Sequence, residues 1–491
     1  MTFTDVKYNR EELRDKIYGC WMGKNIGGTM GAPFEGTHDM LDIPGYTTAK
    51  GEPLPNDDLD LQLIWLRALE HVGPFTMDIN TLGYHWLRYI PASWNEYGIG
   101  KANMKMGLLP PMSGEVNNEA WRNSNGAWIR SEIWACLAPG FPNVATHYAI
   151  MDACIDHGVS EGTVAEIFTA SLESLAFFET DIRTVIEKGL THIPEDSRIA
   201  QDVRLVMEEY DKGTPYREVR QMIVEHDKDL GWFQAPANIA YTVIGLLYGE
   251  GDFKQSLIYA INCGDDTDCT AATCGAILGI MKGYKGIPKE LSEYIGDRII
   301  TMSLDNCFEG RNQIKTCTQL TDRVMKMIPT MLYANEVYCE YTDGETEIDL
   351  EKAATLRPIS QTSAPVRYDL SFLSRPRFSF DILSRHLYAM ASYEKEPRIA
   401  PLGELKVRID LKSLIFDPHW ENVEVALPEG WTCDCPRTVY IPSKTPNTEA
   451  RAVLEFTVTA GERVSSVNRA TVTLTAHTHP DAFIVPLTIL G

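Results

Sequence analysis

The sequence predicts a multi-domain α plus β protein in which a large helical domain precedes an antiparallel β-sandwich. Three observations lead to this prediction. The chain has 491 residues, which is more than a single hydrophobic core usually organises. Apolar residues recur at helical spacing through the first two thirds of the chain. In the last third, apolar and polar residues alternate as they do in strands.

The helical part is predicted to cover residues 1–340. Its apolar runs are separated by short segments rich in Gly, Pro, Asn and Asp, which end helices. The runs occupy residues 59–70, 164–178, 181–188, 199–212, 216–227 and 237–248. Strand-like alternation is rare before about residue 335, so this domain is predicted to be all-α.

The first predicted helix carries a glycine stripe. Gly19, Gly23, Gly27 and Gly31 recur at every fourth position, which leaves one helix face bare. Because glycine is a poor helix former, such a helix needs close packing against another backbone. Glu35 follows the end of this helix. A carboxylate fixed there suits an acid, a base or a partner of metal-bound water, and a solvated loop glutamate is the alternative.

Three carboxylates crowd the start of the next helix, at Asp57, Asp58 and Asp60, directly after Asn56. Asn or Asp before an apolar run is typical of an N-cap, which satisfies free backbone N–H groups. Three acids so close together exceed that need and repel one another unless cations lie between them. The cluster indicates either a site for a hard ion such as Mg²⁺ or Mn²⁺ or an ordinary capped helix.

A second acidic cluster, Asp265, Asp266 and Asp268, precedes a run rich in small residues. A helix of small residues approaches its neighbours closely and is buried, and buried carboxylates are costly without a cation. Residues 256–281 contain no Lys or Arg, so no local partner is available. The cluster therefore predicts metal binding, with a basic partner from elsewhere in the chain as the alternative.

Residues 89–125 interrupt the helical pattern. This segment is rich in aromatic residues, glycine, proline and asparagine, with Trp94, Tyr97, Gly98, Gly100, Gly107, Pro110, Pro111, Gly114, Asn117, Asn118 and Trp121. Long irregular segments inside a compact domain are usually functional. We expect either a loop that lines a ligand cleft or a structural Ω-loop.

Strand-like alternation begins after about residue 345, at residues 404–410, 423–427, 452–460 and 470–476. Turn residues separate these segments at the spacing of a β-sandwich. The segment 427–431 (LPEGW) resembles Ig-like modules appended to carbohydrate-active enzymes. We therefore predict an Ig-like β-sandwich accessory domain over 366–491, joined by a connector at 341–365. A packing or oligomer role and sugar binding are both open for it.

The composition excludes several classes of protein. The net charge is −23, from 45 basic and 68 acidic residues, and basic runs are absent, unlike in a nucleic-acid binder. No stretch approaches the ~20 apolar residues of a membrane span, and the N-terminus has no signal-peptide pattern. The 11 cysteines are scattered, so reduced thiols in a cytoplasmic protein are expected.

Several motifs together resemble one known family. Residues 23–35 (GKNIGGTMGAPFE) resemble the opening motif of the ADP-ribosylglycohydrolases. Residues 56–58 (NDD) are similar to their first metal motif, usually Thr-Asp-Asp or Ser-Asp-Asp. Residues 266–269 (DTDC) are similar to their second, usually Asp-Thr-Asp-Thr, and the resemblance covers about residues 10–330. Between these motifs, residues 125–130 and 156–158 fall where the family has its Asn-Gly-x-x-x-Arg and His-containing segments.

The resemblance implies an all-α fold around two Mg²⁺ or Mn²⁺ ions and the hydrolysis of a glycosidic bond. The expected metal ligands are Asn56, Asp57, Asp58, Asp266, Asp268 and Cys269. The expected catalytic residues are Glu35 and Asp58. The expected substrate-binding residues are Asn125, Gly126, Arg130, Asp156 and His157, joined by Trp94 of the aromatic segment and by Asp265.

Three positions depart from the family pattern. Asn56 and Cys269 stand where the family usually has hydroxyl residues, and Gly28 stands where it usually has Asp. A thiol is a soft donor and a poor ligand for Mg²⁺. The carboxylates of the two motifs are intact, so metal binding is expected to survive. The additional acids Asp60 and Asp265 disfavour a diphosphate in the substrate.

We therefore expect a divalent-metal-dependent hydrolase of an N- or O-glycosidic bond to ribose or a related sugar, acting on a small-molecule glycoside. The alternatives are a glycosidase for nucleosides or small furanosides unrelated to ADP-ribose, and a non-catalytic, metal-dependent binder of a ribose-containing ligand. No nucleic-acid or membrane partner is expected, and a homo-oligomer is open.

Overall fold

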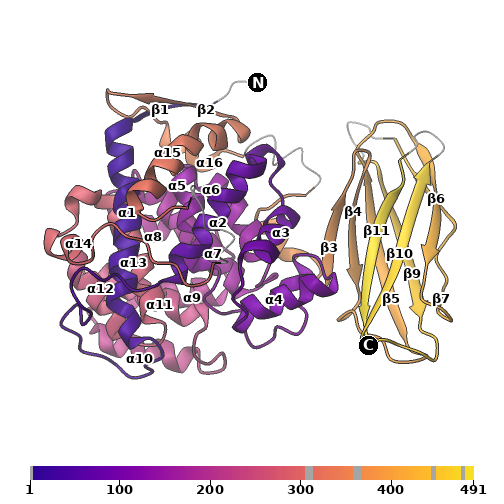
Figure 1. Cartoon of the computed structure of the whole chain (residues 1–491), viewed down its shortest axis with the longest axis horizontal. Coiled ribbons are helices and arrows are strands. Elements are labelled where there is room, and N and C mark those ends of the chain that lie inside the picture. The colour runs from indigo at the N-terminus through magenta and orange to yellow at the C-terminus, as the bar shows by residue number, and fades with distance from the viewer. Residues whose placement is uncertain (1–3, 305–312, 358–365, 444–448, 477–480) are drawn as a thin grey trace.

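The computed structural model describes residues 4–304, 313–357, 366–443, 449–476 and 481–491. Figure 1 shows a helical body beside a separate layer of strands, which confirms the predicted fold class. The helices are α1 (Arg10–Gly31), α2 (Asp57–Val72), α3 (Ile79–Tyr89), α4 (Asn95–Met106), α5 (Glu132–Leu137), α6 (Pro142–Ala153), α7 (Glu161–Ala176), α8 (Ile182–Leu190), α9 (Arg198–Asp211), α10 (Tyr216–His226), α11 (Ala235–Tyr248), α12 (Phe253–Asn262), α13 (Thr267–Lys282), α14 (Lys289–Ile295), α15 (Cys317–Ala334) and α16 (Leu350–Thr355). Within the described residues, each helix is too short or too polar to cross a lipid bilayer.

The glycine stripe of α1 faces α13, and the two helices lie in close contact along their length. A Cβ atom added at Gly23 would lie 2.0 Å from the carbonyl oxygen of Gly275, and one at Gly27 would lie 2.1 Å from that of Ala271. Only glycine permits backbones to approach so closely. This contact brings the end of α1 beside the start of α13, where the second acidic cluster begins.

The helical domain also contains a small sheet that the sequence does not reveal. Strand β1 (Thr4–Asn9) pairs in parallel with β2 (Val337–Thr342), so the segment 1–340 is not all-α as predicted. Parallel pairing of strands this far apart in the chain leaves no hairpin signal in the sequence. After β2, α16 packs on α6, where the Asn143 side chain donates to the Ala354 and Leu356 carbonyls. Residues 358–365 of the predicted connector lie outside the described residues.

The segment 89–125 is not a continuous loop, because α4 occupies Asn95–Met106. Its interior glycines, Gly98 and Gly100, hid this helix from a prediction based on composition. Glycine is needed at Gly98, where a Cβ would lie 2.1 Å from the Ser93 carbonyl oxygen. The helix ends at Gly107, which has the positive φ of 85° typical of a helix C-terminus.

The C-terminal domain consists of two antiparallel sheets. One has the strand order β11-β10-β6-β8 and the other the order β3-β4-β5-β9-β7. The strands are β3 (Ser379–Leu383), β4 (Leu387–Tyr393), β5 (Glu404–Ser413), β6 (His419–Ala426), β7 (Thr432–Cys433), β8 (Thr438–Ile441), β9 (Arg451–Thr459), β10 (Val467–Ala476) and β11 (Phe483–Leu490). Buried and more exposed residues alternate along β5 and β10, so one face of each sheet forms the core.

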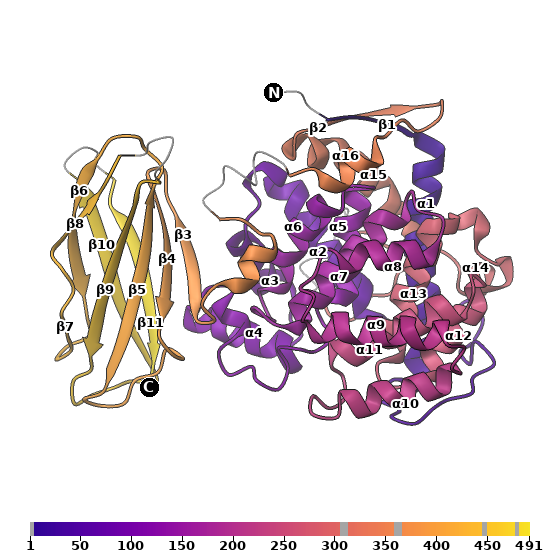
Figure 2. The same cartoon turned by 180° about the vertical axis from the view of Figure 1, so that it is seen from behind.

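The sandwich core takes in residues from the helical domain. Leu108, Met112 and Val116, which follow α4, belong to the hydrophobic cluster of the sandwich. The Thr488 hydroxyl donates to the Gly107 carbonyl at 2.9 Å. Figure 2 shows β3 beside α4 at this junction. The sandwich therefore anchors the segment that follows α4, and the first turn of α4 contributes to the candidate site.

Candidate metal centre

The two acidic clusters lie at the N-termini of two neighbouring helices. Asn56 caps α2, and its side-chain oxygen accepts from the Asp58 N–H at 2.8 Å. Asp266 occupies the same position at the start of α13. The free N–H groups and the dipole of a helix N-terminus favour negative charge, so two such ends support a dense group of carboxylates.

The carboxylates form two groups of three residues that share Asp268. One group is Asp58, Asp268 and Cys269, and the other is Glu35, Asp266 and Asp268. In each group, one ligand atom from each residue lies within 4.8 Å of the others. The structure thus brings together residues from three separate sequence motifs, in two groups that could each hold a metal ion.

The donor set fits hard divalent cations. Oδ1 of Asp266 and Oδ1 of Asp268 are buried and have no hydrogen-bond partner among the described residues. Burial raises the pKa of Asp266 to about 7, and the negative charge of Glu35 acts in the same direction. Burial and the charges of Asp266, Asp58 and Glu35 raise the pKa of Asp268 well above its usual range. Buried, unpaired and mutually repelling carboxylates are stabilised by Mg²⁺ or Mn²⁺, which prefer oxygen ligands.

Cys269 differs from the other members of its group. Its thiol donates to Oδ1 of Asp58 at 3.5 Å. Burial and the charges of Asp266 and Asp58 raise the pKa of the thiol well above its usual range. A thiol is a softer donor than a hydroxyl or a carboxylate. Cys269 thus hydrogen-bonds Asp58 within its group, and its expected role as a metal ligand stays a prediction.

A cavity of about 230 Å³ opens onto this group. Among the predicted site residues, its lining includes Glu35, Asp57, Trp94, Asn125, Gly126, Asp266, Asp268 and Cys269. The remaining lining residues, which the sequence analysis did not select, are Asn95, Glu96, Tyr97, Trp121, Ser124, Ile129 and Phe233. Trp94 is 43% exposed, so the aromatic wall is open to solvent on one side. The aromatic content of 89–125 was the only sequence signal for Tyr97 and Trp121.

Lys24 is the main residue that the sequence analysis missed. Its ammonium lies 2.6 Å from Glu132 and 3.4 Å from Asp58, and all three side chains are fully buried. The two carboxylates raise the pKa of Lys24 above its usual range despite burial. Gln62 donates to the other Glu132 oxygen at 2.7 Å. A lysine inside a glycine-striped, buried helix was the available signal, because it requires a buried acid.

Asp58 is predicted as both a metal ligand and a catalytic residue. Its side chain is fully buried, it is paired with Lys24, and it does not line the cavity. It belongs to the first candidate metal group, and its catalytic role stays a prediction. Glu35 instead remains exposed at the cavity, where desolvation and the charge of Asp58 raise its pKa.

The structure gives a physical reason for two departures from the family pattern. A Cβ at Gly28 would lie 1.8 Å from the side-chain nitrogen of Asn56. The Asn56 amide therefore fills the space that a side chain at position 28 would need. The Asn56 oxygen accepts from the helix and the residue does not line the cavity, so Asn56 serves as the cap of α2. Its expected role as a metal ligand stays a prediction.

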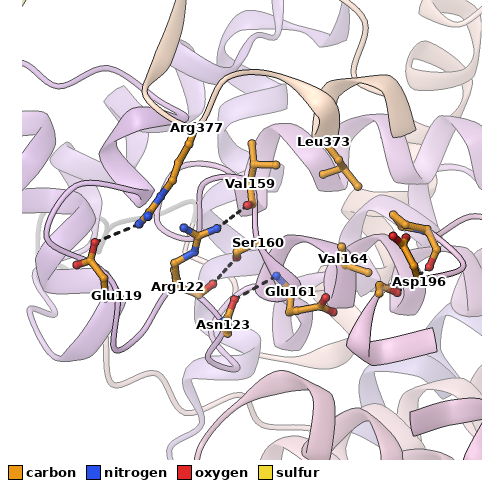
Figure 3. Close-up of a pocket in the computed structure, with 12 residues that line it drawn as sticks. Glu119, Arg122, Asn123, Val159, Ser160, Glu161, Val164, Asp196, Leu373 and Arg377 are labelled. Atoms are coloured by element: carbon orange, nitrogen blue, oxygen red, sulfur yellow. Dashed lines mark hydrogen bonds and ion pairs between the residues drawn. The ribbon is translucent and has the colours of Figure 1, made fainter. Parts of the chain in front are cut away.

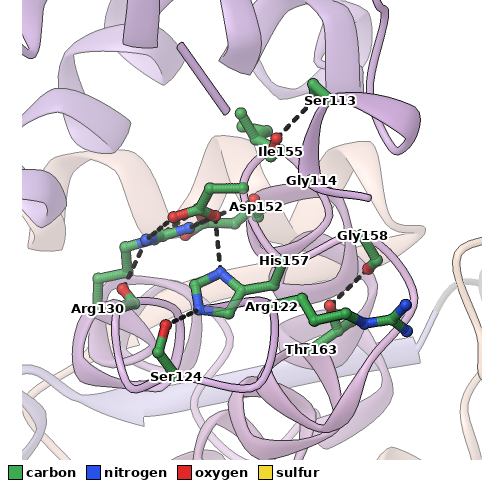
Figure 4. Close-up of polar contacts among 12 residues, drawn as sticks. Ser113, Gly114, Arg122, Ser124, Arg130, Asp152, Ile155, His157, Gly158 and Thr163 are labelled. Carbon is green, nitrogen blue, oxygen red and sulfur yellow. Dashed lines mark hydrogen bonds and ion pairs between the residues drawn. The ribbon is translucent and has the colours of Figure 1, made fainter. Parts of the chain in front are cut away.

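Arg130, Asp156 and His157, predicted to bind substrate, are fully buried and do not line the cavity. Figure 4 shows Arg130 and His157 with their polar contacts. Arg130 pairs with Asp156 at 2.8 Å and donates to the Gly126 carbonyl at 2.5 Å. His157 lies 3.0 Å from Asp156 and 3.5 Å from the Ser124 hydroxyl. These residues hold the wall of the cavity at Ser124 and Gly126 and do not line the cavity themselves. Their direct contact with a substrate stays a prediction.

Of two further residues predicted to bind substrate, Asp265 is buried away from the cavity and Asn125 lines it. Asp265, also predicted to bind substrate, is fully buried and accepts from the Asn238 side chain at 2.8 Å and from the Phe233 N–H at 3.1 Å. It therefore fixes the aromatic residue Phe233 rather than a ligand. Asn125 does line the cavity, and its amide donates to Oδ2 of Asp266 at 2.7 Å.

A larger cavity of about 550 Å³ lies near the junction with the sandwich (Figure 3). Both arginines of its lining are engaged in ion pairs. Arg377 pairs with Glu119 at 3.2 Å, and Arg122 pairs with the buried Glu115 at 2.7 Å. None of the carboxylates of the two metal groups lines this cavity. The smaller cavity is therefore the candidate site.

Comparison with known proteins gives one family. The model of the family described as ADP-ribosylglycohydrolase matches residues 9–328, more than half of the chain. An uncharacterized protein of Archaeoglobus fulgidus is 28% identical over 308 residues, which are 58% of this chain and 93% of that protein. A solved "ADP-ribosylglycohydrolase-related protein complex" aligns with 66% of this chain and 98% of its own chain, at 18% identity and a TM-score of 0.40. A FixG-related protein from Vibrio parahaemolyticus aligns with 22% of this chain and 97% of its own, at 10% identity and a TM-score of 0.18.

Proposed function

Because this chain belongs to the ADP-ribosylglycohydrolase family, whose members are hydrolases of glycosyl bonds, we propose that it cleaves a glycosidic bond to ribose or a related sugar with two divalent cations. The observation that carries the proposal is the pair of three-residue groups that share Asp268 beside an aromatic cavity. Mg²⁺ or Mn²⁺ held there would supply positive charge that anchors vicinal sugar hydroxyls and lowers the pKa of water.

The protein's own residues supply orientation and proton transfer. Glu35 is exposed at the cavity and has a raised pKa, so it is suited to exchange a proton with a bound substrate or water. Trp94, Trp121 and Phe233 form apolar faces on which a sugar or its leaving group can stack. Glycosidic cleavage passes through an oxocarbenium-like state, which a carboxylate beside the sugar, such as Glu35, stabilises.

The acidic lining of the cavity disfavours a substrate whose sugar carries a diphosphate. Its described lining contains the acids Glu35, Asp57, Glu96, Asp266 and Asp268 and no Lys or Arg. Proteins bind phosphates through Arg, Lys or exposed backbone N–H groups. We therefore propose nucleosides and small furanosides as better substrates than ADP-ribosyl conjugates, which are the default substrates of the family.

Metal dependence is tested first. EDTA should abolish glycosidase activity, and Mg²⁺ or Mn²⁺ should restore it. Asp268→Asn should weaken binding of both ions, because Asp268 belongs to both groups. Glu35→Gln should leave at least one ion bound and lower turnover by roughly 10²–10⁴-fold. Asp42→Asn, at a carboxylate that is 93% exposed, is the matched control and should change neither quantity.

Substrate class is tested by turnover of ADP-ribosyl-arginine and ADP-ribosyl-serine against nucleosides and p-nitrophenyl furanosides. Faster turnover of the uncharged compounds supports the proposed preference, and faster turnover of the ADP-ribosyl compounds contradicts it. Metal-dependent binding of these ligands without any product after long incubation would contradict the hydrolase proposal itself and support a binding protein.

A further inference from the structure

A second cluster of metal-ligating side chains lies away from the candidate active site, between α9 and α10. Asp202 lies on α9, His226 is the last residue of α10, and Asp227 follows it. One ligand atom from each residue lies within 4.8 Å of the others. Figure 2 shows α10 at the lower edge of the helical domain with α9 above it, and the two helices are in contact.

The two carboxylates of this cluster are buried and incompletely paired. The Asp202 side chain is 0% exposed and that of Asp227 is 3% exposed. His226 Nδ1 lies 2.6 Å from Asp202 Oδ1 and 3.6 Å from Asp227 Oδ1. The second oxygen of each carboxylate is buried and has no hydrogen-bond partner among the described residues. Unpartnered oxygens of two adjacent buried carboxylates are costly unless a proton or a cation lies between them.

Nearby basic residues do not balance the acids. Arg198 is shared between Asp227, at 2.9 Å, and Asp229, at 3.1 Å. Glu161 is close enough to repel the charge of Asp202. Burial and the charge of Asp227 raise the pKa of Asp202 to about 9. The cluster therefore holds two buried carboxylates and one imidazole nitrogen close together, with the shared Arg198 beside them.

We propose that Asp202, His226 and Asp227 form a separate metal site that binds one Zn²⁺ ion. A mixed set of one imidazole nitrogen and two carboxylate oxygens suits Zn²⁺, whereas Mg²⁺ prefers oxygen ligands and keeps several waters. In a tetrahedral zinc site, neighbouring ligand atoms are about 3.3 Å apart. The 2.6 and 3.6 Å separations lie on either side of this value, so small side-chain movements would complete the geometry.

The fourth ligand position is open to water. The His226 side chain is 37% exposed and forms the outer edge of the cluster, which gives an ion a path from solvent. A three-ligand protein site with one open position is a common zinc arrangement. An ion there would tie α9 to the end of α10 and replace the repulsion between the two carboxylates with attraction.

The site is connected to the candidate active site by one loop. After Asp227, the chain reaches Trp232, whose ring stacks on His38 at a centroid distance of 4.0 Å, and then Phe233 at the cavity. His38 follows Glu35 in the loop after α1. An ion at Asp227 would therefore restrict a loop that forms part of the cavity wall. The metal site itself does not depend on the proposed glycosidase activity.

The test uses the full chain with Zn²⁺ alone as the probe. Because Cys269 and Asp268 could also bind Zn²⁺, the measurement is made in an Asp268→Asn background by calorimetry and by anomalous diffraction at the zinc edge. We expect one Zn²⁺ per chain, with an anomalous peak about 2.0–2.1 Å from His226 Nδ1. Adding Asp202→Asn or His226→Ala should weaken this binding by more than about tenfold. Asp229→Asn is the matched control, because it removes a neighbouring carboxylate outside the group and should leave binding within about twofold.

Thermal unfolding provides a second measurement. Saturating Zn²⁺ should raise the melting temperature of the protein with Asp202 and His226 intact and leave that of the Asp202→Asn variant unchanged. Without zinc, Asp202→Asn should fold and melt no lower than its parent, because it removes a buried repulsion. No bound Zn²⁺, a peak elsewhere, or binding unaffected by both ligand substitutions would overturn the proposal.

Discussion

Replacing Gly27 with alanine tests the close contact that positions the carboxylates of α13. The new Cβ would lie 2.1 Å from the Ala271 carbonyl oxygen and 2.4 and 2.6 Å from two further backbone atoms. Backbone atoms cannot rotate away, so α1 and α13 must separate by about 1 Å to reach van der Waals contact. Overpacking of this kind costs about 2–3 kcal/mol. Alanine favours helix formation by about 1 kcal/mol, which works in the opposite direction.

The assay is thermal unfolding followed by helical circular dichroism, together with calorimetric titration of Mg²⁺ or Mn²⁺. The net cost is about 1–2 kcal/mol. At about 2 °C per kcal/mol for a large domain, Gly27→Ala should therefore lower the melting temperature by about 2–4 °C. Metal binding should weaken as well, because Asp268 lies one turn before the displaced contact. Gly83→Ala is the matched control in helix α3, since its Cβ would meet only side-chain atoms of Met104 and Pro110. A Gly27→Ala protein that melts higher than the wild type, as helix propensity alone predicts, would refute the packing argument.

Three further predictions concern individual side chains. Lys24→Met should destabilise the protein by about 3–5 kcal/mol in thermal unfolding, because it leaves Glu132 and Asp58 buried without their cation. An unchanged melting temperature would show that Lys24 does not form these ion pairs. Burial lowers the pKa of His147 from 6.5 to about 4, so the unfolded chain binds more protons between these values and stability falls as the pH is lowered through them. His147→Phe should reduce this acid-induced loss by roughly 1–3 kcal/mol at pH 4, and an equally steep loss in the variant would contradict it. Gly28→Ala alone should destabilise the protein, and it should destabilise it much less when it is combined with Asn56→Ser. Additive effects of the two substitutions on the free energy of unfolding would contradict the inference that the two side chains need the same space.

The sequence was sufficient to predict the helical domain, the sandwich and the residues that gather at the metal centre. Helical spacing and strand alternation are local patterns, and the acidic clusters are too dense for capping alone. It failed for α4, whose glycines are required by the close approach of the Ser93 backbone. It also failed for β1 and β2, because their parallel pairing joins opposite ends of the domain.

The roles of site residues were less predictable than their positions. Arg130 and Asp265 both lie in segments that resemble the family's motifs. Only the fold shows that Arg130 pairs with Asp156 and that Asp265 accepts from Phe233 and Asn238, away from the cavity. A buried ion pair such as Lys24 with Glu132 joins residues from different helices. A sequence reveals that a buried lysine needs a partner, but not which acid provides it.

The central claim is that the two groups sharing Asp268 hold two divalent ions. A crystal structure with Mn²⁺, recorded with anomalous scattering, tests it most directly. We expect two anomalous peaks near Asp268, one beside Asp58 and the other beside Glu35 and Asp266. Both peaks should be lost in Asp268→Asn. The absence of any peak at these carboxylates in fully Mn²⁺-soaked crystals would contradict it.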